Sequence, residues 1–298
     1  MHIPVLLKEV INYFDPKPNE NYIDATLGEG GHSLELLKRT APYGRLLGID
    51  LDKRNIDFSA QRFLKNQIIS QRFILVQRNF KDIKTIAQEY EFKEVSGILF
   101  DLGLNTYFLE ASGRGFSYRK NEPLDMRFDP GSLSLTARDI INKYSELALQ
   151  KIFQEYGEEK YSKRIASNII KIRTIEPIET TQDLVDIIKN SIPGPEFQKI
   201  HSISRIFQAL RIYINDELEN LKVALLSSLD LLSSNAELIV ISFHSLEDRI
   251  VKNIFKEAAK TKKFQLLTKK PITPTPEEIK SNFSSHSAKM RVIKKLSS

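Results

Sequence analysis

Acids and glycines near the start of this chain have the spacing of a turn that binds a nucleoside. A short apolar run contains Asp24 and leads into a glycine-rich turn with Gly30, Gly31 and His32. A helix-like stretch follows, and a second apolar run then ends at Asp50. This order is typical of strand, loop, helix and strand, with an acid placed to bind a ribose. It predicts a nucleoside-bearing cofactor at the carboxyl end of a parallel sheet.

The glycine spacing narrows the choice of cofactor. A dinucleotide fingerprint needs a third glycine three residues after the second, for helix-to-strand packing, and Ser33 stands at that position. A phosphate loop needs Gly-Lys-Ser/Thr, which is absent from residues 28–33. S-adenosylmethionine carries no phosphate and fits this turn. Asp24 is expected to face its ammonium end and Asp50 to accept hydrogen bonds from the ribose hydroxyls. The alternative interpretation is an ordinary strand-turn-helix with a solvent-exposed acid.

Further polar and aromatic residues follow the later apolar runs. Phe80 comes after the third run and can pack on an adenine, although a core position is the alternative. Asp101 and Asn105 come with the fourth run, and His244 follows the fifth. The alternative to a functional role for His244 is that it caps a helix. Because ligands lie outside the carboxyl ends of parallel strands, we expect these residues to gather at one edge.

The elements that position these residues predict an α/β fold. Its expected class is a doubly wound, mostly parallel, seven-stranded Rossmann-like methyltransferase sheet with an inserted all-helical subdomain. The last two strand runs have only a proline-rich polar stretch between them, which favours an antiparallel connection. The predicted strands are Tyr22–Ala25, Arg45–Leu51, Phe73–Arg78, Gly97–Leu102, Glu237–Phe243, Phe264–Thr268 and Met290–Lys294. The predicted helices between the early strands are Ser33–Thr40, Lys53–Lys65 and Ile83–Tyr90.

The gap between the fourth and fifth strands is too long for one crossover. Its first part, Asn105–Gly131, is predicted to be a loop, and Leu135–Ile192 is helical in pattern. Ser202–Ser228 is predicted to be one long helix returning to the sheet. We therefore expect a methyltransferase domain at 1–131 and 199–298, and a helical substrate-recognition subdomain at 132–198.

The composition excludes several classes of protein. There are no cysteines, so disulfides and thiol nucleophiles are excluded. The five histidines have no zinc-like spacing, so no metal site is expected. No transmembrane run and no signal peptide are recognised. The lack of cysteines is compatible with a cytoplasmic protein. From Ile250 to Ser298 there are twelve basic and three acidic residues, which indicates an anionic partner, nucleic acid first.

Long motifs of the chain resemble those of the bacterial small-subunit (16S) ribosomal RNA cytosine-N4 methyltransferase family. The resemblance implies S-adenosylmethionine as methyl donor, and a cytidine of the decoding region in ribosomal RNA or the 30S subunit as acceptor. A homodimer is among the expected assemblies. The motifs that carry the resemblance are His2–Leu7, Asp24–Ser33, Gly48–Asp52, Gly97–Gly103, Arg114–Ser117, Pro123–Arg127, Phe207–Ile212 and Ile241–Lys252.

The resemblance also implies which residues bind the cofactor. The expected set is Gly30, Gly31, His32, Asp50, Phe80 and Asp101. Where the family has a glutamine that contacts the cofactor, this chain has Phe108, which completes the set of candidates. The family's C-terminal arginine-serine repeats are replaced here by a stretch with Lys289 and Arg291.

Methylation of an exocyclic amine needs an acceptor that polarises the amine and takes its proton. Asp101, Asn105 and His244 are the candidates, and the sequence leaves the choice open. The candidates for RNA contacts are Arg114, Arg127, Arg205, Arg211 and Arg249, with Phe116 and Tyr118 for base stacking. Structural ion pairs are the alternative for each arginine. The competing functions are another nucleotide-binding α/β protein and a non-catalytic, ribosome-associated RNA-binding module.

Overall fold

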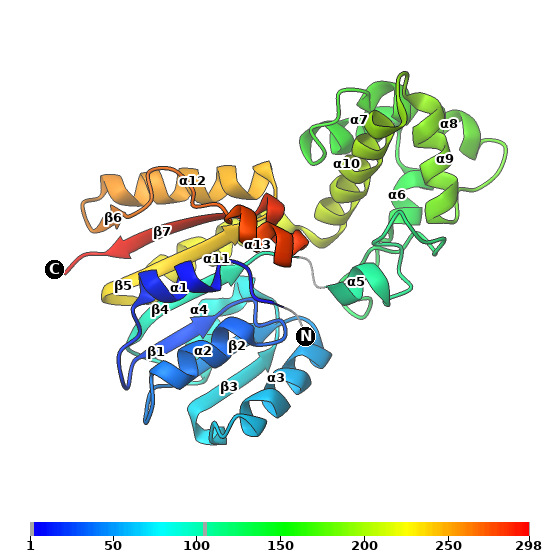
Figure 1. The fold of residues 1–298 in the computed structure, drawn as a ribbon. Helices are drawn as coiled ribbons and strands as arrows, with labels where there is room; N and C mark the ends of the chain where they lie inside the picture. The colour runs from blue at the N-terminus through cyan, green and yellow to red at the C-terminus, as the bar shows by residue number, and fades with distance from the viewer. Residues whose placement is uncertain (1–2, 104–105, 298) are drawn as a thin grey trace. The chain divides into compact units, whose positions relative to one another are not determined.

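The structure, a computed structural model, describes residues 3–103 and 106–297. The chain forms two compact units (Figure 1). The sheet unit comprises Met1–Gly103 and Leu218–Ser298, and the helical unit comprises Leu104–Glu217. The predicted domain boundaries at residues 131/132 and 198/199 both lie inside the observed helical unit. Each unit is described by itself below.

The sheet unit contains a seven-stranded sheet in the order β3-β2-β1-β4-β5-β7-β6. β7 pairs antiparallel with both β5 and β6, and the other pairings are parallel. The predicted doubly wound sheet with one reversed strand near its end is therefore confirmed. The strands are β1 (Asn21–Asp24), β2 (Leu46–Asp50), β3 (Phe73–Gln77), β4 (Val95–Asp101), β5 (Leu232–Ser242), β6 (Phe264–Leu266) and β7 (Lys289–Lys295).

Helices cover both faces of this sheet, so successive strand residues are buried on opposite sides. Ile23 and Leu47 belong to one apolar cluster, whereas their neighbours Tyr22 and Leu46 belong to the other. The helices of the sheet unit are α1 (Leu7–Phe14), α2 (Gly31–Arg39), α3 (Lys53–Lys65), α4 (Ile83–Glu89), α11 (Glu217–Leu231), α12 (Ser245–Lys260) and α13 (Pro276–Ser281). α1, α2 and α3 contribute to one cluster, and α4, α11 and α12 contribute to the other.

The short helix α13 was not expected between the last two strands. Its N-cap is Thr275, whose side chain accepts a hydrogen bond from the backbone N–H of Glu278, and Pro276 occupies the first turn. A proline there is tolerated because that N–H has no partner within the helix. The proline-rich stretch is thus a helix start as well as a connection, and the strand that follows is still antiparallel.

The helical unit packs around its own apolar core, formed by residues such as Ile140, Phe153, Ile165 and Leu184. Its helices are α5 (Thr106–Glu110), α6 (Ala137–Lys143), α7 (Glu146–Glu155), α8 (Ser162–Arg173), α9 (Thr181–Ser191) and α10 (Glu196–Asn215). The predicted loop over Asn105–Gly131 therefore contains one short helix. In the described chain, no helix is long and apolar enough to cross a membrane.

The predicted continuous helix Ser202–Ser228 is wrong, because it breaks between α10 and α11. Asp216 adopts a left-handed conformation with φ of 51°. The preceding Asn215 donates hydrogen bonds from Nδ2 to the carbonyls of Met126 and Arg211, both at 2.8 Å. Its Oδ1 accepts one from the N–H of Phe128 at 2.8 Å. This asparagine stabilises the loop of residues 126–128 and marks the end of α10.

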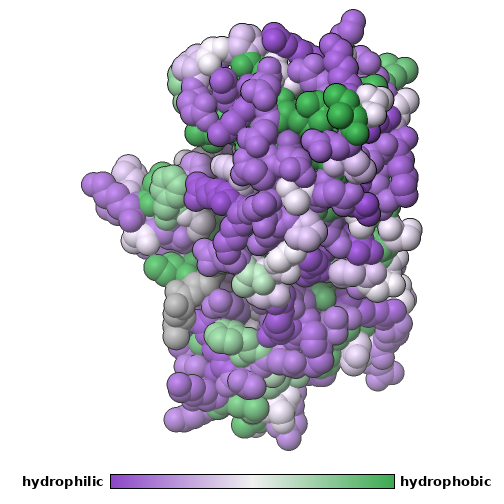
Figure 2. Space-filling model, turned by 90° about the vertical axis from the view of Figure 1, so that its right-hand side faces the viewer, coloured by the Kyte–Doolittle hydropathy of each residue, from purple (hydrophilic) through white to green (hydrophobic). Residues whose placement is uncertain are grey.

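Exposed apolar side chains are scattered over the surface, as is normal for a folded chain. Figure 2 shows one face, on which hydrophilic residues predominate and hydrophobic ones form small groups. The most exposed large apolar side chains are Ile175 (85%), Tyr43 (77%), Phe283 (76%) and Leu147 (75%).

Candidate cofactor site at the acidic edge of the sheet

The glycine-rich turn between β1 and α2 needs glycine at specific positions. Gly28 and Gly30 have φ of 51° and 68°, a region that side chains with a Cβ rarely adopt. A Cβ on Gly30 would also lie 2.8 Å from Ser59 Oγ and 2.9 Å from the ring of Phe63. A Cβ on Gly31 would lie 2.3 Å from Pro4 Cγ. Gly30 and Gly31 are therefore required by packing within the protein, and any cofactor contact from them is a backbone contact.

Helix α3 holds the turn in place. Ser59 donates a hydrogen bond from Oγ to the carbonyl of Gly28 at 3.0 Å, and Arg62 donates one to the carbonyl of Glu29 at 2.9 Å. These bonds satisfy carbonyls that the tight turn leaves without a partner in a strand or helix. The turn is thus held rigidly beside the end of β2.

Asp50 ends β2 and is fixed by three donors. Its Oδ2 accepts hydrogen bonds from the N–H of Gly28 at 2.8 Å and from Asn55 Nδ2 at 3.0 Å, and its Oδ1 accepts one from the N–H of Asp52 at 2.8 Å. Burial raises the pKa of this carboxyl, and the hydrogen bonds oppose that rise. A carboxylate has about four acceptor positions, so this side chain keeps room for a ribose hydroxyl.

Asp24 ends β1 and is almost fully buried, with 1% of its surface exposed. Ser33 Oγ donates to its Oδ2 at 2.6 Å, and the N–H of Thr26 donates to its Oδ1 at 3.2 Å. Burial raises the pKa of Asp24 to about 6, against the effect of these two bonds. The side chain is thus held by groups of the turn itself.

Asp101 ends β4, next to β1 in the sheet. Its pKa is raised to about 7, chiefly by burial and further by the charge of Asp24 and of Glu247. Its Oδ1 is buried and has no hydrogen-bond partner among the described residues. A buried carboxylate oxygen without a donor is costly unless a ligand supplies one. Asp101 therefore has the features expected of a carboxyl that meets a bound ligand.

His32 lies in the first turn of α2 and approaches Asp101. Its Nδ1 is 3.8 Å from Asp101 Oδ2, which is too long for a hydrogen bond. Its Nε2 lies 2.9 Å from the carbonyl of Val5, so Nε2 is the protonated nitrogen that donates. His32 therefore ties the N-terminal segment to the glycine-rich turn.

Phe80 follows β3 and is partly buried against the apolar core of the sheet unit. Its ring meets that of Phe100 edge-on, with centroids 5.7 Å apart. One part of the ring is thus used in the core, and the rest is at the surface. The contact with adenine stays a prediction.

His244 caps α12, the role that was the alternative to a catalytic one. Its Nδ1 accepts a hydrogen bond from the N–H of Glu247 at 3.4 Å, and Glu247 Oε2 accepts one from the N–H of His244 at 3.3 Å. These two bonds form a capping box. Nε2 lies 3.2 Å from Glu247 Oε1. Nδ1 is thus used by the cap, whereas Nε2 is buried and has no hydrogen-bond partner among the described residues, as is true of Asp101 Oδ1.

The last of the three amine-acceptor candidates, Asn105, lies outside the described residues. The described part of the chain shows no group of three or more histidines, cysteines or acids that could hold a metal ion.

Sequence reasoning missed several residues that complete this edge. Glu247 adds a fourth acid, and its position three residues after His244 is the signal of a capping box. Asn55, Ser33 and Ser59 position Asp50, Asp24 and the turn, and they lie on helix faces where the sequence carries no comparable signal. The acidic edge is thus Asp24, Asp50, Asp101 and Glu247.

The acidic edge fits S-adenosylmethionine. Charges of one sign buried together are unfavourable unless a ligand of opposite sign compensates them. The cofactor offers an ammonium and a sulfonium, while its ribose hydroxyls are donors suited to Asp50. A reversed-strand sheet with a glycine-rich turn and this edge defines the class of S-adenosylmethionine-dependent methyltransferases.

Comparison with known proteins identifies the family within this class. The chain matches the model of the MraW methylase family over residues 1–296 and belongs to that family. It is 45% identical to ribosomal RNA small subunit methyltransferase H of Persephonella marina, over 99% of both chains. It is 44% identical to the protein of that name from Caldicellulosiruptor saccharolyticus and 43% identical to that from Mycoplasma mycoides subsp. mycoides, again over 99% of both chains. The protein is a methyltransferase, and S-adenosylmethionine is its cofactor.

The predicted RNA contacts in residues 108–127 have structural partners inside the helical unit. Phe116 is 6% exposed, and its ring stacks on Phe128 with centroids 5.3 Å apart. Phe108 is 7% exposed and lies 5.0 Å from both rings. The role of Phe116 as a base-stacking platform does not fit, because its face is already covered. Phe108 likewise lies in the core of the helical unit, and its cofactor contact stays a prediction.

The arginines of this segment are also engaged. Arg114 donates to the carbonyls of Arg127 and Phe128 at 2.8 and 3.1 Å. Arg127 forms two parallel hydrogen bonds with Asp125, at 2.8 and 2.7 Å. Both arginines therefore make structural hydrogen bonds or ion pairs within the helical unit, which was the alternative to an RNA contact.

The other arginine candidates differ in their surroundings. Arg211 pairs with Glu217 through bonds of 2.8 and 3.0 Å. Arg205 is half-exposed and lies 3.7 Å from the buried carboxylate of Glu159. Asp248, the acid next to Arg249 in the sequence, pairs with Arg291, at 2.6 and 3.1 Å. RNA contacts by Arg205, Arg211 and Arg249 stay predictions.

Proposed function

We propose that this methyltransferase transfers a methyl group to the exocyclic N4 amine of a cytidine in the decoding region of small-subunit (16S) ribosomal RNA. The names of the relatives support ribosomal RNA of the small subunit as substrate. The resemblance of the motifs supports the N4 amine of a cytidine. Its partner is the RNA itself or the 30S subunit, in the cytoplasm. A homodimer stays a prediction.

The chemical part of the proposal depends on the buried carboxyl of Asp101, which has a raised pKa and one oxygen without a donor among the described residues. S-adenosylmethionine supplies an electrophilic methyl group on a positively charged sulfur. The cytosine amine is a poor nucleophile because its lone pair is delocalised into the ring. Asp101 Oδ1, which lacks a donor among the described residues, would accept a hydrogen bond from this amine and take its proton as the N–C bond forms, while the methyl–sulfur bond breaks and S-adenosylhomocysteine is the leaving group. A carboxyl with a pKa of about 7 is a suitable base at neutral pH.

The remaining acids have different roles in this mechanism. Asp50 holds the ribose, and Asp24 faces the ammonium end of the cofactor. The helical unit recognises the RNA, and the cytidine is reached while unpaired or flipped out of its helix.

The proposal is tested by mapping methylated cytidines in small-subunit ribosomal RNA. RNA from cells lacking the enzyme is incubated with the purified protein and S-adenosylmethionine, both as free RNA and as 30S subunits. We expect one cytidine of the decoding region to gain an N4 methyl group. Methylation of another base, or at ring carbon C5, would contradict the proposal. A matched reaction with Asp101→Asn controls for contaminating activities.

A further inference from the structure

Helix α8 and the turn before it carry a group of cations that line one pocket of the helical unit. The pocket has a volume of about 560 Å³. Its basic lining residues are Lys160, Lys163, Arg164 and Lys171, and its one acid is Glu146. The other lining side chains are Tyr161, Ser167 and Asn168, so no aliphatic side chain is among the eight. The pocket is therefore strongly positive and polar.

These cations differ from their neighbours in lacking carboxylate partners. In the same unit, Lys143 pairs with Asp139 at 2.7 Å, and Arg138 pairs with Glu179 at 2.6 Å. Lys151 and Lys189 are also paired with acids. Over residues 3–103 and 106–297, no ion pair involves Lys160, Lys163, Arg164 or Lys171. Lys160 lies over the ring of Tyr161, 4.8 Å from its centroid. The cations of this pocket therefore outnumber its one acid, and none of them is in an ion pair among the described residues.

The helix presents these cations on a fixed surface. Ile165, Ala166 and Ile169 are fully buried in the core of the helical unit, so α8 is anchored along its inner face. Lys163, Arg164 and Lys171 are exposed on its outer face. Lys163 and Lys171 are eight residues apart on one face, which separates them by about 12 Å along the helix axis. This spacing lets them meet different phosphates of one strand.

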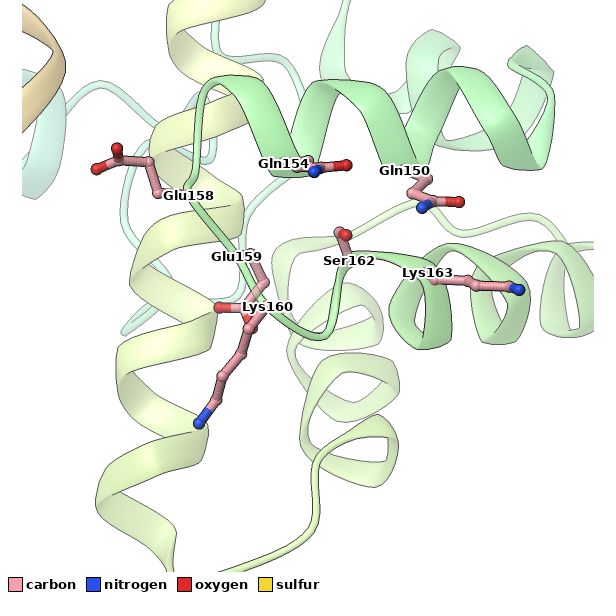
Figure 3. Close-up of a pocket in the computed structure, with 7 residues that line it drawn as sticks. All are labelled: Gln150, Gln154, Glu158, Glu159, Lys160, Ser162 and Lys163. Carbon is pink, nitrogen blue, oxygen red and sulfur yellow. The ribbon is translucent and has the colours of Figure 1, made fainter.

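A second, adjoining pocket of about 400 Å³ extends the surface toward α7. Lys160, Ser162 and Lys163 line it together with Gln150, Gln154 and two acids, Glu158 and the buried Glu159 (Figure 3). In the close-up, Gln150 and Gln154 project from α7 toward the segment that bears Ser162 and Lys163. Amide and hydroxyl groups can donate to phosphate and sugar oxygens beside the cations.

We propose that the α8 surface, formed by Lys160, Lys163, Arg164 and Lys171, binds the phosphate backbone of the RNA substrate. This rests on the proposed function, which makes RNA the substrate. Charge complementarity supports RNA, because cations that neutralise phosphates release counterions. The polar lining distinguishes the surface from a protein interface, whose buried core is apolar and poor in charge. The contacts orient the substrate without reading its sequence.

The test measures binding of a labelled RNA fragment from the decoding region to the full-length protein over a range of salt concentrations. The double variant Lys163→Ala/Lys171→Ala is compared with Lys65→Ala/Lys93→Ala, which removes the same charge from two exposed lysines of the sheet unit. We expect the α8 variant to lose about 0.7 in the logarithmic salt slope for each phosphate contact, and to bind roughly tenfold more weakly at about 0.1 M salt. The control variant should bind as the wild type does.

Further measurements distinguish the loss of a phosphate contact from other reasons for weaker RNA binding. Lys163→Arg/Lys171→Arg keeps the charge and should restore both the slope and the affinity. An unrelated RNA of equal length should lose affinity by the same factor. Calorimetry with S-adenosylmethionine checks that the cofactor site is intact in each variant.

Three results would overturn the inference. One is an α8 variant with the salt slope of the wild type. Another is an equal loss in the control variant. A third is unchanged binding of free RNA with weaker binding of 30S subunits, which would identify a ribosomal protein as the partner. If the wild type itself neither binds nor methylates the RNA, the proposed function fails, whatever the variants do.

Discussion

Each unit of this enzyme holds one local group of like charges, acids at the sheet edge and cations on α8, and the two groups differ in burial. The sheet unit buries its acids: Asp24 is 1% exposed, and Asp101 has an oxygen without a partner. The helical unit keeps its group of cations on the exposed face of α8. A small cationic cofactor needs a few desolvated acids at fixed positions, because buried interactions are strong. A long polyanion needs dispersed, solvated cations, because its binding depends on counterion release. Under the proposal for the α8 surface, the cofactor and the RNA backbone are therefore bound by different units.

The largest effect is expected at Asp101. Asp101→Asn keeps the shape of the side chain but removes the base, so the single-turnover methylation rate should fall by about 10²-fold or more. The affinity for RNA should stay within a few-fold of the wild type. Rapid-quench kinetics at saturating cofactor measures the rate. A nearly normal rate for Asp101→Asn would show that Asp101 is not the base and that the acidic edge only binds the cofactor.

Asp50 should affect the cofactor alone. Asp50→Ala removes a carboxylate that already meets three donors, so S-adenosylmethionine should bind about 10- to 100-fold more weakly. Calorimetry measures the dissociation constant, and Asp52→Ala is the neighbouring acid control. An unchanged constant for Asp50→Ala would break the assignment of the ribose to this edge.

Arg127 in the helical unit is a useful contrast to the α8 cations, because its charge is paired with Asp125. Arg127→Ala leaves half-buried Asp125 unpaired, and we expect a loss of about 2 kcal/mol in unfolding free energy. Urea denaturation measures this loss. The salt slope of RNA binding, measured on the folded protein, should not change. A lower slope with unchanged stability would make Arg127 an RNA contact, as first predicted.

The raised pKa values of Asp24, about 6, and Asp101, about 7, make cofactor binding depend on pH. A carboxyl with a raised pKa is protonated below that value, so the edge loses negative charge as the pH falls from about 7 to 5. The affinity for S-adenosylmethionine should therefore weaken by up to about tenfold per pH unit for each carboxyl. S-adenosylhomocysteine lacks the sulfonium charge and should weaken less. Equal pH profiles for the two ligands would show that the acids do not sense that charge.

His244 should give the smallest effect on catalysis. Because it caps α12, His244→Asn supplies another good cap and should leave the methylation rate within a few-fold of the wild type. His244→Ala should lower stability by about 1 kcal/mol. A 10²-fold lower rate for a stable His244→Asn protein would instead support the histidine as a base.

Much of the sheet unit could be predicted from its sequence, because short apolar runs and glycine turns are local signals. The reversed strand was predicted because the sequence shows no helical pattern between Phe264 and Met290, although the short helix α13 forms there. Asp24, Asp50 and Asp101 were recognisable because each ends a strand, and parallel strands bring such ends together.

The helical unit was less predictable at its irregular positions. The break at Asp216 depends on Asn215 bonding to Met126, a residue far away in the sequence. The positions of Phe108 and Phe116 depend on a core that only the folded unit creates. The arginines of this region gave a charge signal, but whether a charge is compensated is decided by neighbours in space, such as Asp125 for Arg127.

The N-terminal segment meets α13 and the residue that follows it, and this has a consequence for biosynthesis. Leu6 donates its N–H to Glu278 Oε1 at 2.7 Å, and Asn282 Nδ2 donates to the carbonyl of Ile3 at 3.0 Å. The same N-terminal segment is bonded to His32 through Val5. The segment of Ile3 to Leu6 is therefore fully held only after the chain has been synthesised beyond Asn282. The bracing of the glycine-rich turn is thus completed late in translation.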